Sequence, residues 1–397
     1  MKKLLYLTPE FPYPPDSGGK LKTWMLLEYL STKYELHLCL FTKTDRQKVN
    51  KYEFLQKLKI NVSRYYSERL DIPRNIRSLI LSYRENIPLT VYRHFSQSFK
   101  NYIDDIIEQF DVVFIDYFSM YQYIPDSFKG RKILHTHNAE YIMWERKTPL
   151  EKNPLIKFLI YLENKRVKNY EKRIYENADD ILCVSSNDVE NIKKIVTDKD
   201  KITLIPTTGD DYLLSLPEID YGGTEKSILY MGTLSWEANA DGLIWFIKNC
   251  WNVIEEKNQG VKLYIIGASP GKELKKVVKS SKDIILTGYI DNLEEYYRKS
   301  RVFIAPLRFG SGIKVKVLNA MCRGIPVVTT PVGAEGIEAL DMVHLCIADS
   351  PEEFANEVNI LLSENKIWEN MKENSRKLMR GKYNRNYIYK ELDRLLD

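Results

Sequence analysis

The chain has 397 residues, of which 44% are hydrophobic and 28% charged, and its formal net charge is +5. This length predicts two domains, and the composition is that of a globular protein able to bury a core in each. The mild positive charge does not call for a nucleic-acid partner, and none is expected. It suits an acidic ligand such as a nucleoside diphosphate, or an anionic membrane surface.

Neither a disulfide framework nor a membrane span is expected. None of the five cysteines has CxxC spacing, so we expect small buried thiols in a reducing cytoplasm. The opening apolar run stops at Leu7 and is followed by Pro9 and Pro12, which is too short for a signal peptide. No run of about 18 apolar residues is present, so no transmembrane helix is predicted.

Short apolar runs alternate with helical patterns along almost the whole chain. The first series of predicted strands covers residues 4–7, 35–41, 112–116, 132–135, 181–184 and 202–205. A second series covers residues 227–231, 262–266, 283–286, 302–305 and 326–329. Helical patterns between them include residues 21–31, 187–195, 242–256, 293–299 and 313–323. The alternation predicts βαβ units, and therefore an α/β fold of two doubly wound Rossmann-like domains with parallel sheets.

The two series meet at residues 207–227, which are rich in Asp, Gly, Pro and Thr and have no helical period. Such a stretch predicts a linker between a first domain over residues 1–210 and a second over 222–379. After residue 349 the chain is mainly helical, and Ser350 followed by Pro351 predicts the start of a helix.

The strongest functional pattern covers residues 308–328, directly after a predicted strand. The small-residue turn 310–312 opens a helix that is expected to end at Gly324. Unpaired backbone N–H groups and the helix dipole make such a helix start an anion site, and Lys314 and Lys316 add positive charge there. The pattern predicts a diphosphate site; the alternative is a plain strand-to-helix turn with solvated lysines.

A second glycine turn follows the first predicted strand, where Gly18 and Gly19 precede a helical pattern that begins at Leu21. Ligands bind at the carboxyl ends of the strands in open α/β sheets, so this turn is a candidate binding segment. It does not have the GxGxxG spacing, which disfavours a dinucleotide-dependent dehydrogenase.

Two of the five histidines occur in the segment from His135 to Glu140, at the carboxyl end of a predicted strand. His135 and His137 share one strand face, as two metal ligands would. No further Cys or His lies nearby in the sequence, so a hydrogen-bonding or catalytic histidine is favoured and no metal is expected.

Residues 73–103 combine positive charge with apolar and aromatic side chains. Five basic residues stand against the single acid Glu85, and Ile80, Tyr83 and Phe95 lie among them. Such a surface suits an anionic membrane. A solvated helix face over an ordinary core is the alternative.

Taken in order and spacing, these features resemble the glycosyltransferase group 1 family (glycosyltransferase family 4), whose members have the GT-B fold. In the first domain the resemblance rests on residues 17–19, 137–138, 178–179 and 184–188. In the second it rests on residues 230–233, 265–267, 286–290, 305–307 and 310–336. It covers nearly the whole chain.

The resemblance implies two domains that face each other across a cleft, with the last helix, residues 380–397, completing the first domain. It implies a retaining transfer that needs no metal and no cofactor, because lysines, arginines and a helix N-terminus stabilise the leaving diphosphate. The catalytic residues that it implies are His137 and Lys314. The implied donor-binding residues are Gly18, Gly19, Gly232, Thr233, Gly288, Tyr289, Ile290, Arg308, Ser311, Gly312, Ile313, Lys316 and Asn319.

The sequence departs from the family at the diphosphate motif. Ser311 and Asn319 stand where the family usually has a pair of glutamates, so Asn319 offers the ribose an amide in place of a carboxylate. The family's arginine–lysine pair after the first strand of the second domain is also absent, and Lys314 or Lys316 is expected to replace it. Both UDP- and GDP-sugars stay open as donors.

The predicted function is a retaining glycosyltransferase acting on a saccharide or lipid-linked acceptor in bacterial surface polysaccharide or glycoconjugate assembly. The expected location is cytoplasmic, with a possible peripheral position on the inner face of the cell membrane. A catalytically impaired GT-B scaffold or binding protein is the first alternative, because the usual glutamates are missing. A GT-B enzyme of another reaction, such as a sugar epimerase, is disfavoured because no paired carboxylates are placed for epimerisation.

Overall fold

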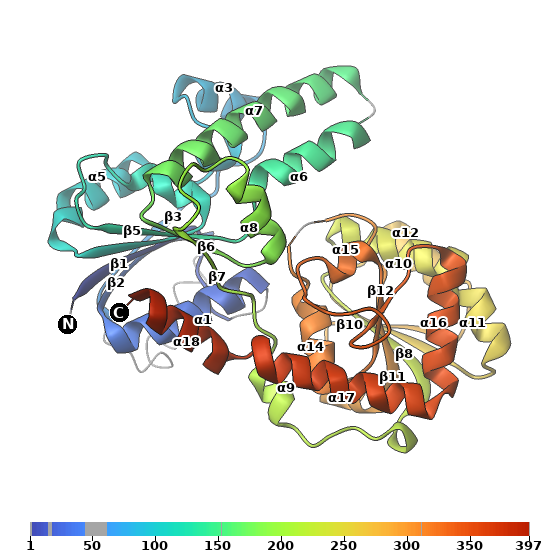
Figure 1. Ribbon diagram of the computed structural model, residues 1–397. Helices are drawn as coiled ribbons and strands as arrows, with labels where there is room; N and C mark the ends of the chain where they lie inside the picture. The colour runs from blue at the N-terminus through green and yellow to red at the C-terminus, as the bar shows by residue number, and fades with distance from the viewer. Residues whose placement is uncertain (1, 15–17, 44–61, 152, 311, 397) are drawn as a thin grey trace. The chain divides into compact units, whose positions relative to one another are not determined.

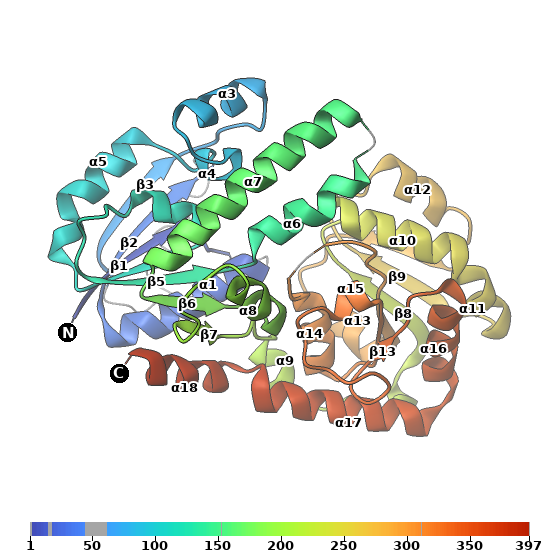
Figure 2. The same cartoon turned by 45° about the horizontal axis from the view of Figure 1, so that its top comes forward.

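The computed structural model describes residues 2–14, 18–43, 62–151, 153–310 and 312–396. Ser311 and the residues just before Gly18 therefore lie outside the described part of the chain. The chain divides into two compact units, Met1–Ile205 and Pro206–Asp397 (Figures 1 and 2). Each unit is built on its own parallel sheet, which confirms the predicted α/β class with two doubly wound domains.

The sheet of the first unit has seven parallel strands in the order β3-β2-β1-β4-β5-β6-β7. Their bounds are β1 Lys3–Thr8, β2 Glu35–Thr42, β3 Val62–Arg69, β4 Val112–Asp116, β5 Arg131–Thr136, β6 Asp180–Cys183 and β7 Ile202–Leu204. The helices are α1 Gly18–Lys33, α3 Ile76–Arg84, α4 Leu89–Tyr92, α5 Gln97–Ile106, α6 Glu140–Lys147, α7 Pro154–Asn177 and α8 Ser186–Lys193. Consecutive residues of β1 from Leu4 to Leu7 are fully buried, because both faces of the sheet are covered.

The sheet of the second unit has six parallel strands in the order β10-β9-β8-β11-β12-β13. Their bounds are β8 Glu225–Met231, β9 Lys262–Ile266, β10 Ile284–Gly288, β11 Ser300–Ala305, β12 Val327–Thr329 and β13 Cys346–Ile347. The helices are α9 Asp211–Ser215, α10 Glu237–Asn249, α11 Trp251–Lys257, α12 Lys272–Val278, α13 Glu294–Lys299, α14 Val315–Arg323, α15 Pro331–Ala334, α16 Pro351–Ser363, α17 Asn365–Lys382 and α18 Arg385–Leu396. Ile228 belongs to the core on one face of this sheet and its neighbour Leu229 to the core on the other.

Several local predictions are confirmed. Gly324 ends α14 in the left-handed conformation, with φ 85°. Ser350 caps α16, and its side chain and that of Glu353 form a capping box. All five cysteines are buried and free.

The predicted linker is more structured than its composition suggested. It contains α9, whose first turn is capped by the Asp210 side chain, and Leu213 and Ile219 are buried in the core of the second unit. The boundary between the units lies just before it, after Ile205. The completion of the first domain by residues 380–397 stays a prediction.

Strand β3 was not predicted. Its sequence, Val-Ser-Arg-Tyr-Tyr-Ser-Glu-Arg, lacks an apolar run because it is the edge strand of the first sheet. An edge strand is covered less completely than the central ones, so it can carry polar side chains on much of its length.

Candidate active site

The first candidate site lies at the carboxyl ends of β1, β4 and β5. The chain leaves β1 toward β2 on one side of the sheet, while β4 pairs with β1 on the other. In open α/β sheets, ligands bind at such a reversal of strand order. The register of β4 and β5 places Asp116 directly beside His135, and His137 follows two residues later.

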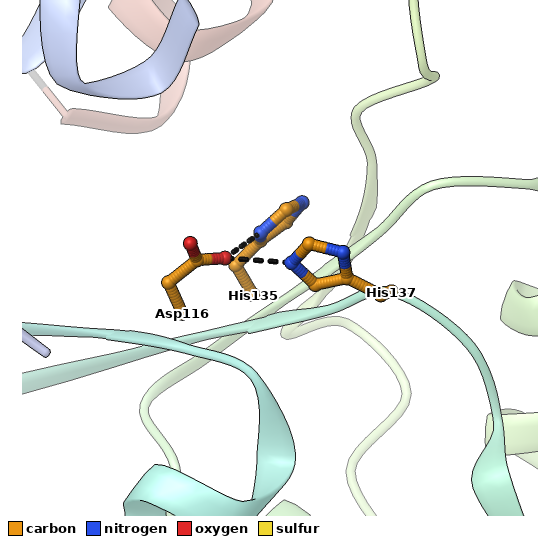
Figure 3. Close-up of side chains that lie close together, drawn as sticks. All are labelled: Asp116, His135 and His137. Carbon is orange, nitrogen blue, oxygen red and sulfur yellow. Dashed lines mark hydrogen bonds and ion pairs between the residues drawn. The ribbon is translucent and has the colours of Figure 1, made fainter. Parts of the chain in front are cut away.

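The Asp116 carboxylate holds both histidines (Figure 3). Its Oδ1 accepts a hydrogen bond from His135 Nδ1 at 2.7 Å and another from His137 Nε2 at 2.8 Å. Its Oδ2 accepts from the Thr23 hydroxyl of α1. Asp116 and His135 are fully buried, whereas His137 is partly exposed.

These contacts fix the protons of the cluster. Burial alone would raise the pKa of Asp116, but the charge of His137 and the hydrogen bonds from both histidines outweigh it and hold the pKa below the usual range. Burial lowers the pKa of His135 to about 4, so this ring is neutral at pH 7. Because an ionised carboxylate only accepts, each histidine donates to it, and His137 Nδ1 is left for another partner.

That Nδ1 faces the first turn of α1, which begins at Gly18, earlier than the predicted start at Leu21. A Cβ added to Gly19 would lie 3.5 Å from His137 Nδ1, so the glycine lets the backbone pass close to the ring. A pocket of about 250 Å³ opens beside it. It is lined by Thr8, Pro9, Glu10, Gly19, Thr23, Lys43, His94, Asp116, Tyr117 and His137.

Tyr117 adds a strained backbone to this pocket. Its φ is 97°, a conformation that a residue with a bulky side chain rarely adopts. Its ring meets His137 edge-on at 5.6 Å, and its hydroxyl donates to Glu140 Oε1 at 3.0 Å. Burial raises the pKa of Glu140, although the hydrogen bond from Tyr117 works against the shift. The strain is thus stored where the polar side chains converge.

Asp116, His135 and His137 have the composition of a metal-ligand set. Their two N···O distances of 2.7 and 2.8 Å are those of N–H···O hydrogen bonds, in which each imidazole contributes a proton. Metal independence stays a prediction.

The second candidate site lies at the carboxyl ends of β8 and β11, before α14. Lys316 Nζ donates to the Tyr230 hydroxyl at 2.9 Å and to Asn239 Oδ1 at 2.6 Å, and it lies 4.5 Å from the centre of the Tyr230 ring. A Cβ on Gly232 would lie 3.3 Å from that Nζ. Lys316 as a residue is only half-buried, but burial of its amine lowers its pKa to about 7, with help from the charge of Lys314.

The other residues of the predicted diphosphate motif have contacts of their own. Lys314, the N-cap residue of α14, is buried, and its Nζ donates to the Gly312 carbonyl. Arg308 forms a two-pronged ion pair with Asp241 of α10, with both distances 2.7 Å. A Cβ on Gly310 would touch the exposed ring of Trp236 at 3.5 Å. The helix start is thus basic and closely approached by the β8–α10 loop.

The structure thus brings the predicted residues of each unit together only in part. Gly19 lies beside His137, and Gly232 lies beside Lys316. Asn319 has a structural partner, because its Oδ1 accepts the Asp210 amide at 3.1 Å. Tyr289 is 72% exposed, Thr233 is exposed, and Ile290 packs against the core of the second unit. Ile313 also packs there, and Gly288 has φ 81°.

Sequence reasoning missed the partners that hold the predicted residues. These are Thr23, Asp116, Tyr117, Tyr230, Asn239 and Asp241. The position of Asp116 and Tyr117 at the end of a predicted strand was a usable signal. Only the strand order shows that this end lies next to His137.

Residues 225–364 match the family described as "Glycosyl transferases group 1". The chain is also 26% identical over 369 residues to an uncharacterized 44.6 kDa protein in the cps region of Klebsiella pneumoniae, with 90% of each chain covered.

Three solved structures are similar over nearly their whole length. Anabaena HepE in complex with UDP and glucose has a TM-score of 0.68 at 12% identity, with 100% of this chain and 99% of that chain covered. Sucrose-phosphate synthase from Thermosynechococcus elongatus has a TM-score of 0.69 at 16% identity, with 100% and 98% covered. A variant of S. aureus TarM in complex with Fondaparinux, alpha-GlcNAc-glycerol and UDP has a TM-score of 0.66 at 12% identity, with 100% and 99% covered.

At these identities the structural likeness establishes the fold, and the family match lies within the second unit. Both agree with the resemblance that the sequence motifs indicated. The chain has the GT-B fold, and residues 225–364 of its second unit match the group 1 glycosyltransferase family, which together support a glycosyltransferase.

Proposed function

We propose that the protein transfers a sugar from a UDP-sugar to a saccharide or lipid-linked acceptor, with retention of the anomeric configuration. The bond between the anomeric carbon and the diphosphate oxygen breaks, and a bond to an acceptor hydroxyl oxygen forms. The acceptor hydroxyl gives its proton to the oxygen of the leaving diphosphate, and the products are UDP and the new glycoside. Retention is the outcome that the family resemblance implies.

The observation that carries the proposal is the basic start of α14. Its first-turn N–H groups, Lys314 and Lys316 are the groups that would neutralise a leaving diphosphate without a metal. The UDP in the HepE and TarM complexes favours UDP over GDP as the donor nucleotide. We assign no cofactor.

In the first unit, we propose that His137 binds the transferred sugar. Its Nε2–H is committed to Asp116, so Nδ1 is the ring atom that would contact a sugar hydroxyl. Gly18 and Gly19 give the donor close access to the backbone.

A role in surface polysaccharide assembly is supported by the relative in a cps region. Among the described residues, no helix is long and apolar enough to span a bilayer. We propose a cytoplasmic protein placed at the inner face of the membrane, where lipid-linked acceptors lie.

The deciding experiment is thermal unfolding with UDP, GDP, ADP and CMP and their sugars, each with magnesium or with EDTA. We expect a rise in Tm with UDP and UDP-sugars that is equal in both conditions. A rise that requires magnesium would overturn metal independence, and a rise with GDP alone would overturn the donor assignment.

A scaffold function has one observation in its favour. The Asn319 side chain, which stands where the family usually has a glutamate, accepts the Asp210 amide and so has a structural use. UDP binding without turnover of any UDP-sugar, including slow hydrolysis, would favour the scaffold.

A further inference from the structure

Helix α3 is amphipathic, but its polar face is buried and its apolar face is exposed. Ser78 and Ser82 are buried, while Ile76 and Ile80 are 76% and 63% exposed and Tyr83 is also exposed. Residues 76, 80 and 83 lie on one side of a helix, at spacings of four and three. A helix on the surface of a globular protein normally turns its apolar side to the core. The apolar side of α3 faces outward.

The start of α7 is apolar and exposed as well. Leu155 and Phe158 are 68% and 56% exposed, and Ile156, Leu159 and Tyr161 are exposed too. Asn153 and Pro154 begin the helix, so these side chains belong to its first two turns. In both views α6 and α7 run side by side and project from the sheet of the first unit (Figures 1 and 2).

One arginine ties the two helices together. The Arg166 guanidinium of α7 donates to the Ser82 carbonyl at 2.8 Å and to the Ile87 carbonyl beyond α3. It stacks on the Tyr83 ring at 3.8 Å and pairs with Glu163 at 2.7 Å. Arg166 thus fixes α3 against the middle of α7, the helix whose first turns carry the exposed apolar residues. We call the exposed residues of α3 and of the first half of α7 the α3–α7 surface.

Positive charges predominate on this surface, where Glu85, the C-cap of α3, is an exposed acid. Arg77 and Arg84 of α3 are exposed, as are Lys157 and Lys165 of α7. Helix α3 contains no acidic residue, and the acid in the first half of α7, Glu163, is buried against Arg166. Exposed aliphatic and aromatic side chains among a majority of cations match an anionic bilayer, whose acyl boundary takes the apolar groups while its headgroups pair with the cations.

We propose that the α3–α7 surface docks the protein on anionic phospholipid bilayers. This inference rests on the membrane location proposed above and gives that location a surface. The proposed contact differs from the one that the sequence pattern over residues 73–103 predicted, because it combines α3 with the start of α7. Of residues 73–103 only α3 presents apolar side chains outward, since Val91 and Phe99 are fully buried.

The test is co-sedimentation of the full chain with vesicles of pure phosphatidylcholine, or of phosphatidylcholine and phosphatidylglycerol at about 7:3. We expect binding to the anionic vesicles only, and its loss at high salt. Leu155→Ser with Phe158→Ser should lower the bound fraction at least about tenfold, and Arg77→Glu with Lys157→Glu should do the same. Matched controls in the second unit are Leu340→Ser, which is 63% exposed, and Lys272→Glu, also exposed.

The Tm and its rise with UDP, measured on each variant, separate this proposal from the proposed function. A variant whose Tm still rises with UDP but that no longer co-sediments with the vesicles supports the docking surface and does not affect the proposed transfer reaction. Full binding by both double variants would overturn it, as would equal binding to neutral vesicles. A wild-type dimer in solution that Phe158→Ser converts to a monomer would also overturn it, because a second copy would then cover the surface.

Discussion

A carboxylate shared by two histidines limits both rings more than a single contact would. Asp116 accepts from His135 and His137 through the same oxygen, so neither ring can rotate without breaking a buried hydrogen bond. A partner of this kind orients a reactive histidine and stabilises one of its tautomers. Asp116 is thus a positioning residue for His137.

Replacement of Asp116 by Asn tests this role. The neutral amide is a weaker hydrogen-bond acceptor than the carboxylate, and it removes the negative charge that attracts the N–H groups of both rings. We expect kcat to fall by about a hundredfold, while the Kd for UDP stays within about twofold because the diphosphate contacts lie in the second unit. Turnover and isothermal titration measure the two quantities. His344→Gln, in the second unit, is the control; a parallel loss of UDP affinity would show that Asp116 acts through folding.

The lowered pKa of Lys316 predicts that donor binding depends on pH. Its pKa is lowered to about 7 in the free protein, and a bound diphosphate would raise it, so binding takes up a proton above pH 7. The affinity for UDP should therefore fall as the pH rises from about 7 to 9, by up to about tenfold per unit. Titration calorimetry in buffers of different ionisation enthalpy measures the proton directly.

Lys316→Met should weaken UDP binding at pH 7 by roughly tenfold or more and remove most of the pH dependence. The exposed Lys248, which pairs with Glu273 on the surface, provides the control Lys248→Met. An unchanged pH slope in Lys316→Met would assign the proton to another group.

At the level of elements, close packing around the second candidate site depends on a helical glycine. A Cβ on Gly242 of α10 would lie 2.2 Å from the Pro306 carbonyl oxygen, in the segment that leads from β11 to α14. Gly381 of α17 is also helical, but a Cβ there would meet nothing within 4 Å. The two glycines form a matched pair.

Gly242→Ala should lower the free energy of unfolding by about 2 kcal/mol, because α10 must move away from the β11–α14 segment. Gly381→Ala should raise it by up to about 1 kcal/mol, since alanine favours the helix and meets no obstacle. Urea unfolding of both variants measures the difference. Equal effects would show that α10 can shift freely.

The helices and strands show which parts of the fold could be predicted from the sequence and which could not. Central strands such as β1 and β4 were predicted because burial on both faces demands continuous apolar residues. The polar edge strand β3 was not, and α10 was placed at residues 242–256 although it spans Glu237–Asn249. Its start has no side-chain cap to mark it, and Cys250 separates it from α11.

For the site, glycine turns and the His-x-His pattern pointed to segments that lie at strand ends. Their partners come from other strands and helices. Asp116 meets His137 because β4 pairs with β5, and Asn239 meets Lys316 because α10 follows β8. Such contacts depend on strand order and helix placement, which a pattern along one segment does not contain.

At the level of the whole molecule, each unit has a core of its own, so each can respond separately to ligand and to pH. The histidines are unevenly distributed: four of the five belong to the first unit. Burial lowers the pKa values of His37, His94 and His135 to about 4. In the unfolded chain these rings would titrate near 6.5.

Acid should therefore weaken the first unit before the second. Between pH 6.5 and 4 the unfolded first unit binds protons at three histidines that its folded form excludes, so their contribution to its stability is complete above about pH 6.5 and falls as the pH drops. Buried Glu171, whose pKa burial raises to about 8, works in the opposite direction but is one group against three. His37 and His135, both fully buried, would each contribute roughly 3 kcal/mol to that fall. Calorimetry should resolve two transitions, with acid lowering the Tm of one and UDP raising the Tm of the other. A single transition that shifts as a whole with both acid and UDP would mean that the two cores unfold as one cooperative unit, in which a change at His137 also alters the stability of the unit that holds Lys316.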